Sequence, residues 1–472
     1  MAKDLVHPYM PNSVPAIKKE MLAELGVKSI KEIYESIIPK DLLYKKRLDL
    51  PEAIRSESEL KKHVMGLLNE NITTEEYTSF LGAGCYKHQV PAICDELNAR
   101  GEFLTAYCGD TYSDHGKMQA IFEYASMLGE MLDVDVVSYT MYDAGQAVTS
   151  ALSTALRVKE AAGRPKNKVL VPATMDPEIY SQACEYLRHK ATLVKVAYDR
   201  ETGLMDLRDL KKKLKGRDVA AVFYENPSYL GFFETNASLI AKLAHERDAL
   251  AIARPEVAAL GIMESPANLG ADILCGDIQP LGMHIQFGGG QSGFMACRQD
   301  IKLVEQFPTY MYGITKTANK GEFGWGRAMN QRCSHGSREN AKEYFGTETG
   351  LWGITAGIYL ASMGPQGMYE LGETIIQNQA YLKKILNNVP GVKAGVFTTG
   401  GFQEVLVNFD KTGKTAREIN KALLKAQIFG GKSMKEAFPE LGESALYCVS
   451  ELTTEEDMEN LAMALKKIVG VC

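Results

Sequence analysis

The histidines and cysteines of the chain are far apart in sequence, and their spacing matches no known metal-binding or redox motif. The histidines that we considered as ligands, His88, His115, His284 and His335, lie far apart, so we expect each to be structural and predict no metal site. Nine cysteines form no CxxC pair, which favours buried thiols in a reducing compartment over zinc ligands or disulfides. We therefore predict a cytoplasmic protein.

A glycine pair, Gly82 and Gly84, lies in the segment FLGAGCY at 80–86. A dinucleotide loop needs GxGxxG directly after the strand of a βαβ unit. The third glycine is missing and no strand clearly precedes the pair, so we do not predict a NAD site.

The segment TAYCGDTYSDHG at 105–116 combines acidic, aromatic and imidazole side chains. Asp110, Asp114 and His115 could recognise a cationic or larger amine, and solvated turn residues are the alternative. Tyr107 and Tyr112 could line a channel, although tyrosines near strand ends are often half-buried packing groups. Both alternatives stay open at this point.

Composition describes an ordinary globular protein of 472 residues, with 45% hydrophobic and 24% charged residues. The net charge of −6 disfavours a nucleic-acid role, which usually shows a basic excess. No apolar run reaches the roughly 18 residues that a membrane-spanning helix needs. We therefore expect partners other than nucleic acid or membrane.

The elements that must position a site follow from periodicity. Between about 168 and 300, short β-rich runs alternate with amphipathic stretches, which predicts a largely parallel sheet with helices on both faces. We expect a helical arm at 1–75, a large α/β domain at 76–350, and a connecting helix with a small C-terminal α+β domain at 351–472. In the last segment, Thr453 to Glu456 fits a capping box before a helix.

Several motifs, in a fixed order, resemble subunit 1 of the glycine cleavage system P-protein, the N-terminal-type subunit of a two-subunit glycine decarboxylase. The likeness begins at HPYMP, residues 7–11, and continues to the last helix. The motifs are FLGAGCY at 80–86, RGEF at 100–103, TAY at 105–107, QAIFEY at 119–124, MYD at 141–143, GADI at 270–273, QPLG at 279–282 and FPEL at 438–441.

This resemblance implies the type I fold of pyridoxal-phosphate (PLP) enzymes and a heterotetramer of two plus two subunits. It also implies a reaction: decarboxylation of glycine, with transfer of the aminomethyl group to the lipoyl arm of the H-protein. In the family, subunit 2 carries the lysine that holds PLP. Subunit 1 would complete the active site of that partner.

By the same resemblance, three positions that hold PLP in subunit 2 differ here. The alignment places Pro280 at the Schiff-base lysine, and proline has no amine to offer. It places Arg254 at the aspartate that faces the pyridine nitrogen, where a cation disfavours ring protonation. It places Asp143 near the phosphate, which a carboxylate repels. We therefore expect no catalytic residue and no cofactor in this chain.

Some loops depart from the family pattern. Where subunit 1 usually reads TAYTPYQPEISQG, residues 105–116 are shorter and gain acidic residues, and MYDGATA has become MYDAGQA at 141–147. In 335–346 only Arg338 and Lys342 of a basic pattern survive. The candidates for an interface or channel are Cys85, Tyr86, Tyr107, Asp110, Tyr112, His115, Arg338 and Lys342.

Because these loops differ while the framework is kept, alternatives to glycine decarboxylation remain. One is a non-catalytic scaffold or regulatory paralogue. Another is a subunit of a related PLP decarboxylase that acts on a different small amino acid. A third is a self-sufficient PLP decarboxylase that uses an unaligned lysine.

Overall fold

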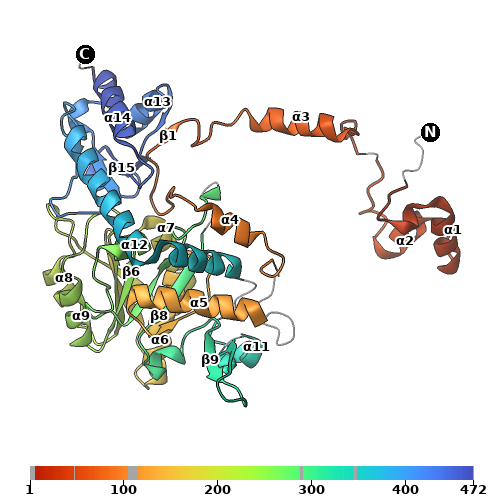
Figure 1. Ribbon diagram of the computed structural model, residues 1–472, viewed down its shortest axis with the longest axis horizontal. Coiled ribbons are helices and arrows are strands. Elements are labelled where there is room, and N and C mark those ends of the chain that lie inside the picture. Colours follow the sequence, from red (N-terminus) through yellow and green to blue (C-terminus); the bar gives the residue numbers. More distant parts are fainter. Residues whose placement is uncertain are drawn as a thin grey trace. The chain divides into compact units, whose positions relative to one another are not determined.

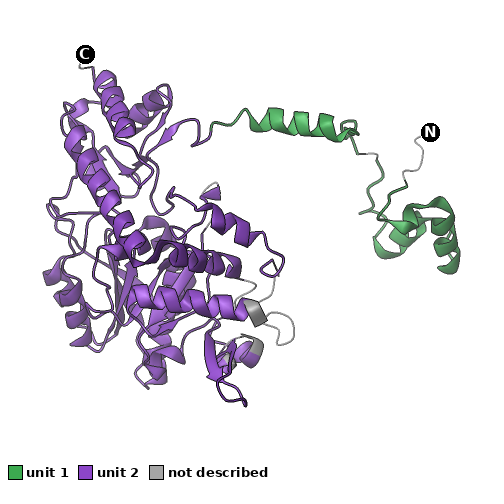
Figure 2. Cartoon of the chain, in the orientation of Figure 1, with its two compact units in different colours: residues 1–72 green, residues 73–472 purple. Residues whose placement is uncertain are grey.

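The computed structural model describes residues 6–46, 48–104, 115–286, 291–332, 334–343 and 348–470. The chain divides into two compact units, unit 1 (Met1–Ile72) and unit 2 (Thr73–Cys472), coloured separately in Figure 2. No helix in the described ranges is both long and apolar enough to cross a membrane.

The described residues of unit 1 form three α-helices, α1 (Pro15–Glu24), α2 (Ile30–Ile37) and α3 (Glu57–Leu68). The side chains of Ser29 and Ser56 cap α2 and α3 by accepting backbone N–H groups of their first turns. No described residue of unit 1 is buried, so this unit has no core of its own.

Unit 2 is built around a seven-stranded sheet in the order β2-β8-β7-β6-β5-β3-β4 (Figure 1). Strands β3 to β7 are mutually parallel, whereas β8 is antiparallel to β7 and β2 is antiparallel to β8. The sheet prediction is confirmed. The strands are β2 (Val136–Val137), β3 (Lys168–Pro172), β4 (Thr192–Val196), β5 (Val219–Asn226), β6 (Leu250–Pro255), β7 (Ile273–Asp277) and β8 (Gly293–Cys297).

Helices cover both faces of this sheet, each over its own apolar core. One core includes residues of α5, α8, α9 and α12, and the other includes residues of α6 and α7. The helices are α4 (Ala92–Asn98), α5 (His115–Leu132), α6 (Ala144–Ala161), α7 (Pro177–Leu187), α8 (Leu207–Lys213), α9 (Ala237–His245), α10 (Ile301–Val304), α11 (Ser334–Ser337) and α12 (Gly350–Leu386).

Helix α12 leads to the C-terminal region and is kinked at Gly364, which has φ +60° and is followed by Pro365. The C-terminal region holds a four-stranded antiparallel sheet in the order β11-β12-β15-β14. Its elements are β11 (Lys393–Ala394), β12 (Glu404–Asn408), α13 (Ala416–Leu424), β14 (Lys432–Ser433), β15 (Ser444–Cys448) and α14 (Glu455–Ile468).

Two small pairings complete unit 2. Strand β1 (Thr78–Ser79) pairs in parallel with β13 (Ile428–Phe429), so the chain just after unit 1 joins the C-terminal region. Strands β9 (Tyr312–Lys316) and β10 (Phe323–Arg327) form an antiparallel hairpin.

The capping box of the last helix lies one residue later than predicted. Thr454, not Thr453, accepts the backbone N–H of Asp457, and the Asp457 side chain accepts that of Thr454. Aspartate serves here in place of the glutamate of the usual pattern because its carboxylate reaches the same N–H.

Candidate functional site

Charged side chains gather where the parallel strands of unit 2 end. Glu225 lies near the end of β5, Arg254 near the end of β6, and Asp277 is the last residue of β7, while Asp176 follows β3. In open α/β sheets, ligands bind outside this carboxyl edge. The edge is therefore the candidate functional site.

Arg254 is the central cation of this edge. Its side chain is 11% exposed, and its Nη1 lies 3.2 Å from Oε1 of Glu225, which is 1% exposed. Burial opposes the charge of Arg254, but the carboxylates of Glu225 and Asp176 outweigh burial and raise its pKa further. Burial raises the pKa of Glu225 to about 7, and the guanidinium opposes that rise.

Further buried carboxyl groups surround the pair. Burial raises the pKa of Asp277 to about 7, although the backbone N–H of Gln279 donates to it at 2.6 Å. Burial raises the pKa of Glu404 to about 8, and Glu404 Oε1 accepts the backbone N–H of Ala83 at 2.5 Å. Burial also raises the pKa of Glu256. The edge is acidic and largely desolvated.

The space left beside Arg254 is small. A cavity of about 20 Å³ is lined by residues that include Tyr86, Arg254 and Glu404. Four polar atoms of residues in its lining are buried and have no hydrogen-bond partner among the described residues: Ser228 Oγ, Tyr229 Oη, Gln403 Oε1 and Glu404 Oε2. A water molecule needs roughly 10–15 Å³ and two to four polar partners, so the cavity suits one water.

Pro280 follows β7 in a buried turn of the same edge. Its neighbour Gln279 uses its side chain to bind the backbone of Tyr86, accepting from the N–H at 3.1 Å and donating to the carbonyl at 2.8 Å. These bonds hold the segment at 80–86 against the turn after β7. Pro280 brings no amine to this position.

Asp143 occupies the N-terminus of α6. Its carboxylate accepts the backbone N–H of Gln146 at 2.7 Å, and its carbonyl oxygen packs against Gly293 at the start of β8. A helix N-terminus attracts phosphate through its free N–H groups. Here the carboxylate of Asp143 already accepts one of these N–H groups.

These residues do not fit PLP. A bound PLP needs an amine, a cradle that tolerates the phosphate, and a site of roughly 300 Å³ or more. Pro280 has no amine, Asp143 brings an anion, and Arg254 brings a cation. The cavity beside Arg254 is about 20 Å³. The assignment of the three positions to lost PLP contacts stays a prediction.

The interface candidates differ in their surroundings. Cys85 is partly exposed, and burial followed by the charge of Asp277 raises its pKa to about 11, so its thiol is not activated. Tyr86 is buried and lines the cavity, whereas Arg338 is exposed and Lys342 is half-buried. Tyr107, Asp110, Tyr112 and the side chain of His115 lie outside the described residues.

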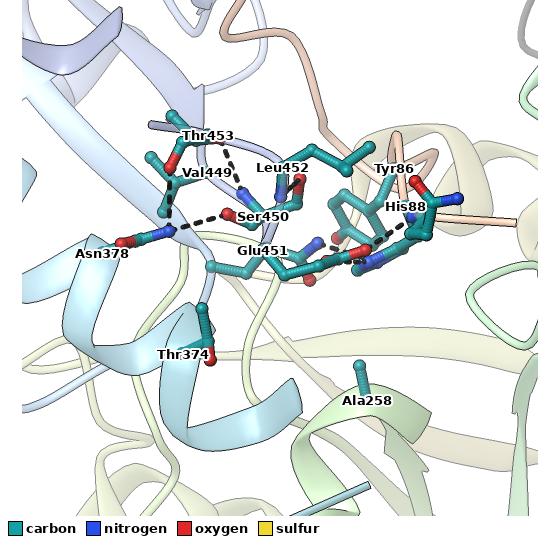
Figure 3. Close-up of polar contacts among 12 residues, drawn as sticks. Tyr86, His88, Ala258, Thr374, Asn378, Val449, Ser450, Glu451, Leu452 and Thr453 are labelled. Carbon is teal, nitrogen blue, oxygen red and sulfur yellow. Dashed lines mark hydrogen bonds and ion pairs between the residues drawn. The ribbon is translucent and has the colours of Figure 1, made fainter. Parts of the chain in front are cut away.

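One polar cluster was missed by the sequence reasoning. His88 Nδ1 lies 2.7 Å from Glu451 Oε2, and the backbone N–H of Gln89 donates to the other oxygen of Glu451 at 2.6 Å. Burial raises the pKa of Glu451, but the hydrogen bond and charge of His88 outweigh it and lower the pKa overall. Figure 3 shows Glu451 on the loop after β15, with its carboxylate toward His88. In the same loop, the carbonyls of Ser450 and Thr453 accept hydrogen bonds from the side chain of Asn378 in α12.

The partners in this cluster lie far apart in sequence, which explains the miss. His88 and Glu451 are 363 positions apart, so no local spacing signals their contact. Among the described residues, no group of three or more histidine, cysteine, aspartate or glutamate side chains is arranged to hold a metal ion.

The chain is similar to known proteins over nearly its whole length. Residues 8–465 match the family described as glycine cleavage system P-protein. Similar curated proteins include the probable glycine dehydrogenase (decarboxylating) subunit 1 of Staphylothermus marinus, 36% identical over 98% of both chains. The protein of the same description from Thermococcus onnurineus is 38% identical over 98% of this chain and 99% of its own.

Solved structures agree with this result. A glycine decarboxylase (P-protein) of the glycine cleavage system, in inhibitor-bound form, has a TM-score of 0.84 and 29% identity, covering 98% of this chain and all of its own. A sphingosine-1-phosphate lyase from Burkholderia pseudomallei shares the fold, with a TM-score of 0.64 and 13% identity over 92% of this chain and 94% of its own. The fold is the predicted type I fold of PLP-dependent enzymes.

Proposed function

The chain belongs to the glycine cleavage system P-protein family, as predicted, and from this premise we propose that it is subunit 1 of a glycine decarboxylase. The complex decarboxylates glycine and transfers the aminomethyl group to the lipoyl group of the H-protein. The chain matches relatives described as subunit 1 over 98–99% of their length, which supports the assignment to this subunit.

The proposal that subunit 2 holds PLP and this chain does not is supported by the carboxyl edge of the sheet. Arg254 lies there among buried carboxyl groups, Pro280 follows β7, and the cavity beside Arg254 has room for one water. PLP therefore belongs to a subunit 2 partner, which supplies the lysine. This chain supports the geometry of that partner and helps form the channel that admits the lipoyl arm and excludes bulk water.

We propose a complex of two copies of each subunit in the cytoplasm. The cytoplasmic assignment is supported by the free thiols of the six described cysteines, since cytosolic proteins keep cysteines reduced. The proposed partners of this chain are a small amino acid, the partner subunit and a lipoylated carrier protein.

Reconstitution tests the proposal. This chain, a subunit 2 partner and lipoylated H-protein are combined, and exchange of labelled bicarbonate into the carboxyl group of glycine is followed. We expect exchange with both subunits present and little with either alone, and a partner with its PLP lysine replaced serves as the control. Exchange into another small amino acid would change the substrate, and no exchange with any amino acid would favour the scaffold alternative.

A further inference from the structure

A basic pocket lies at the amino ends of three neighbouring strands, at the end of the sheet opposite the carboxyl edge. Three loops form it, which lead from α6 into β3, from α8 into β5 and from α9 into β6. Its volume of about 460 Å³ lies within the range of roughly 300–1,000 Å³ that small-molecule sites have. Charged residues dominate its lining: the basic residues are Arg164, Lys166, Arg217 and Arg247, and the acidic residues are Glu246 and Asp248.

Asp248 collects the cations on one side of the pocket. Its carboxylate lies 3.0 Å from Lys159 Nζ, 2.8 Å from Arg164 Nη1 and 3.2 Å from Lys166 Nζ. The side chains of the two lysines are only 7% and 6% exposed. Lys166 also donates to the carbonyl of Arg247 at 3.3 Å. One carboxylate therefore faces three cations that the fold holds in place.

Asp248 lies at the left-handed position of the turn that ends α9. Its φ is +54°, and the backbone N–H of Ala249 beyond it donates to the carbonyl of Ala244 at 3.0 Å. Glycine is the usual residue at such a position, because a side chain there costs roughly 1 kcal/mol. The backbone geometry therefore does not require an aspartate. The three cations do, since a glycine would leave them together without a counter-charge.

The positive charges around the pocket exceed the negative ones. The pocket lining and Lys159 together have five cations and two carboxylates, an excess of three charges. The described residues place no carboxylate within ion-pair distance of Arg217 or Arg247. The C-terminal ends of α6, α8 and α9 lead into this edge, and each supplies up to about half a negative charge. About one to two positive charges therefore have no counterpart.

Repulsion among these cations acts on Lys166. Burial lowers the pKa of Lys166, and the like charges of Lys159 and Arg164 lower it further, while Asp248 opposes the fall. An anion that binds beside the cations would weaken this repulsion. A phosphate group matches the excess charge, because it carries about 1.5 to 2 negative charges at pH 7.

We propose that the pocket binds a small molecule through a phosphate group, held by the guanidinium groups of Arg217 and Arg247. Guanidinium groups pair with phosphate oxygens through two parallel hydrogen bonds. Pro165 is the one apolar side chain among the described residues that line the pocket, so charge and not an apolar body selects the ligand. The site uses no residue of the carboxyl edge and does not depend on the proposed function.

Titration calorimetry of the full chain with pyrophosphate tests the site, at an ionic strength of about 0.15 M that screens distant charges. The test variant combines Arg217→Gln with Arg247→Gln. The matched control combines Lys215→Gln with Lys242→Gln, which removes the same charge from the α8–β5 loop and from α9 outside the pocket lining. We expect the wild type and the control to bind one pyrophosphate per chain, and the test variant to bind at least about tenfold more weakly.

Thermal unfolding gives a second readout. Pyrophosphate should raise the unfolding temperature of the wild type and of the control, and that of the test variant less, because a ligand stabilises the folded state that it binds. AMP and inorganic phosphate are titrated in parallel, and the tighter of the two shows whether the ligand is a phosphate ester or the free ion.

Three results would overturn the proposal. They are a wild type that does not bind pyrophosphate, equal weakening in the test variant and the control, and citrate that binds the wild type as tightly as pyrophosphate does. Equal weakening would show a general attraction by surface cations, and equal citrate binding would show a pocket that does not select phosphate. The comparison with citrate uses the wild type alone, so it holds even if the test variant does not fold.

Discussion

Replacement of Arg254 by methionine removes the cation at the centre of the carboxyl edge. The Arg254 side chain is 11% exposed and its Nη1 lies 3.2 Å from Glu225 Oε1. Opposite charges about 4 Å apart attract by about 4 kcal/mol at an effective dielectric constant of about 20. Loss of one partner of a buried pair costs about 3–5 kcal/mol because the other charge stays buried. We expect Arg254→Met to lower the free energy of unfolding by about 3 kcal/mol at pH 8.

The cost depends on pH and on Glu225. Burial raises the pKa of Glu225 to about 7 even beside Arg254, so without the guanidinium this pKa rises further. Below about pH 6, Glu225 is then protonated and neutral, and the loss shrinks. The double variant Arg254→Met with Glu225→Gln leaves no buried charge of this pair, so it recovers most of the stability at pH 8.

Urea unfolding followed by circular dichroism measures these free energies at pH 5.5 and pH 8 for the wild type, both single variants and the double variant. A free energy of unfolding for Arg254→Met within about 0.5 kcal/mol of the wild type at pH 8 would show that the guanidinium does not stabilise the buried carboxylate. An equal cost at both values of pH, or no recovery of stability when Glu225→Gln is added to Arg254→Met, would show the same.

Three further predictions concern the same edge. Burial raises the pKa of Glu404 in the folded state to about 8 from 4.5, so the stability of the folded state is lost as pH rises through 8. In urea unfolding at pH 9, Glu404→Gln should therefore have a free energy of unfolding about 1 kcal/mol or more above that of the wild type. A Cβ at Gly82 would lie 2.4 Å from the Cβ of Cys448, so Gly82→Ala should lower the free energy of unfolding by about 1–3 kcal/mol, while Gly101→Ala, with nothing within 4 Å, should not. Pro280→Lys supplies an amine but leaves the surrounding charges, so it should give no absorbance band of lysine-bound PLP; such a band would show that the amine alone was missing.

The framework could be predicted from sequence because the strands of the parallel sheet read as short apolar runs between amphipathic helices. The order of the strands could not be predicted, nor could the antiparallel pairing of β8 with β7 and with β2. Strand pairing is set by contacts between residues far apart in sequence. The predicted position of the capping box was wrong by one residue because Thr453 and Thr454 are both followed by an acidic residue three positions later.

The resemblance named positions for the site, among them Arg254 and Pro280, and their assignment stays a prediction. Glu404 and Glu451 come from the C-terminal region, and only folding brings Glu404 to Ala83 and Glu451 to His88. No local pattern marks such contacts. The segment at 105–114, one of those that depart from the family pattern, lies outside the described residues.

The most direct test of the division of labour is to find which subunit binds PLP. The active complex is reduced with borohydride, which fixes PLP to its lysine, and both subunits are digested and analysed by mass spectrometry. We expect the pyridoxyl group on a lysine of the partner and on no lysine of this chain. A pyridoxyl group on a lysine of this chain, in stoichiometric amount, would contradict this expectation.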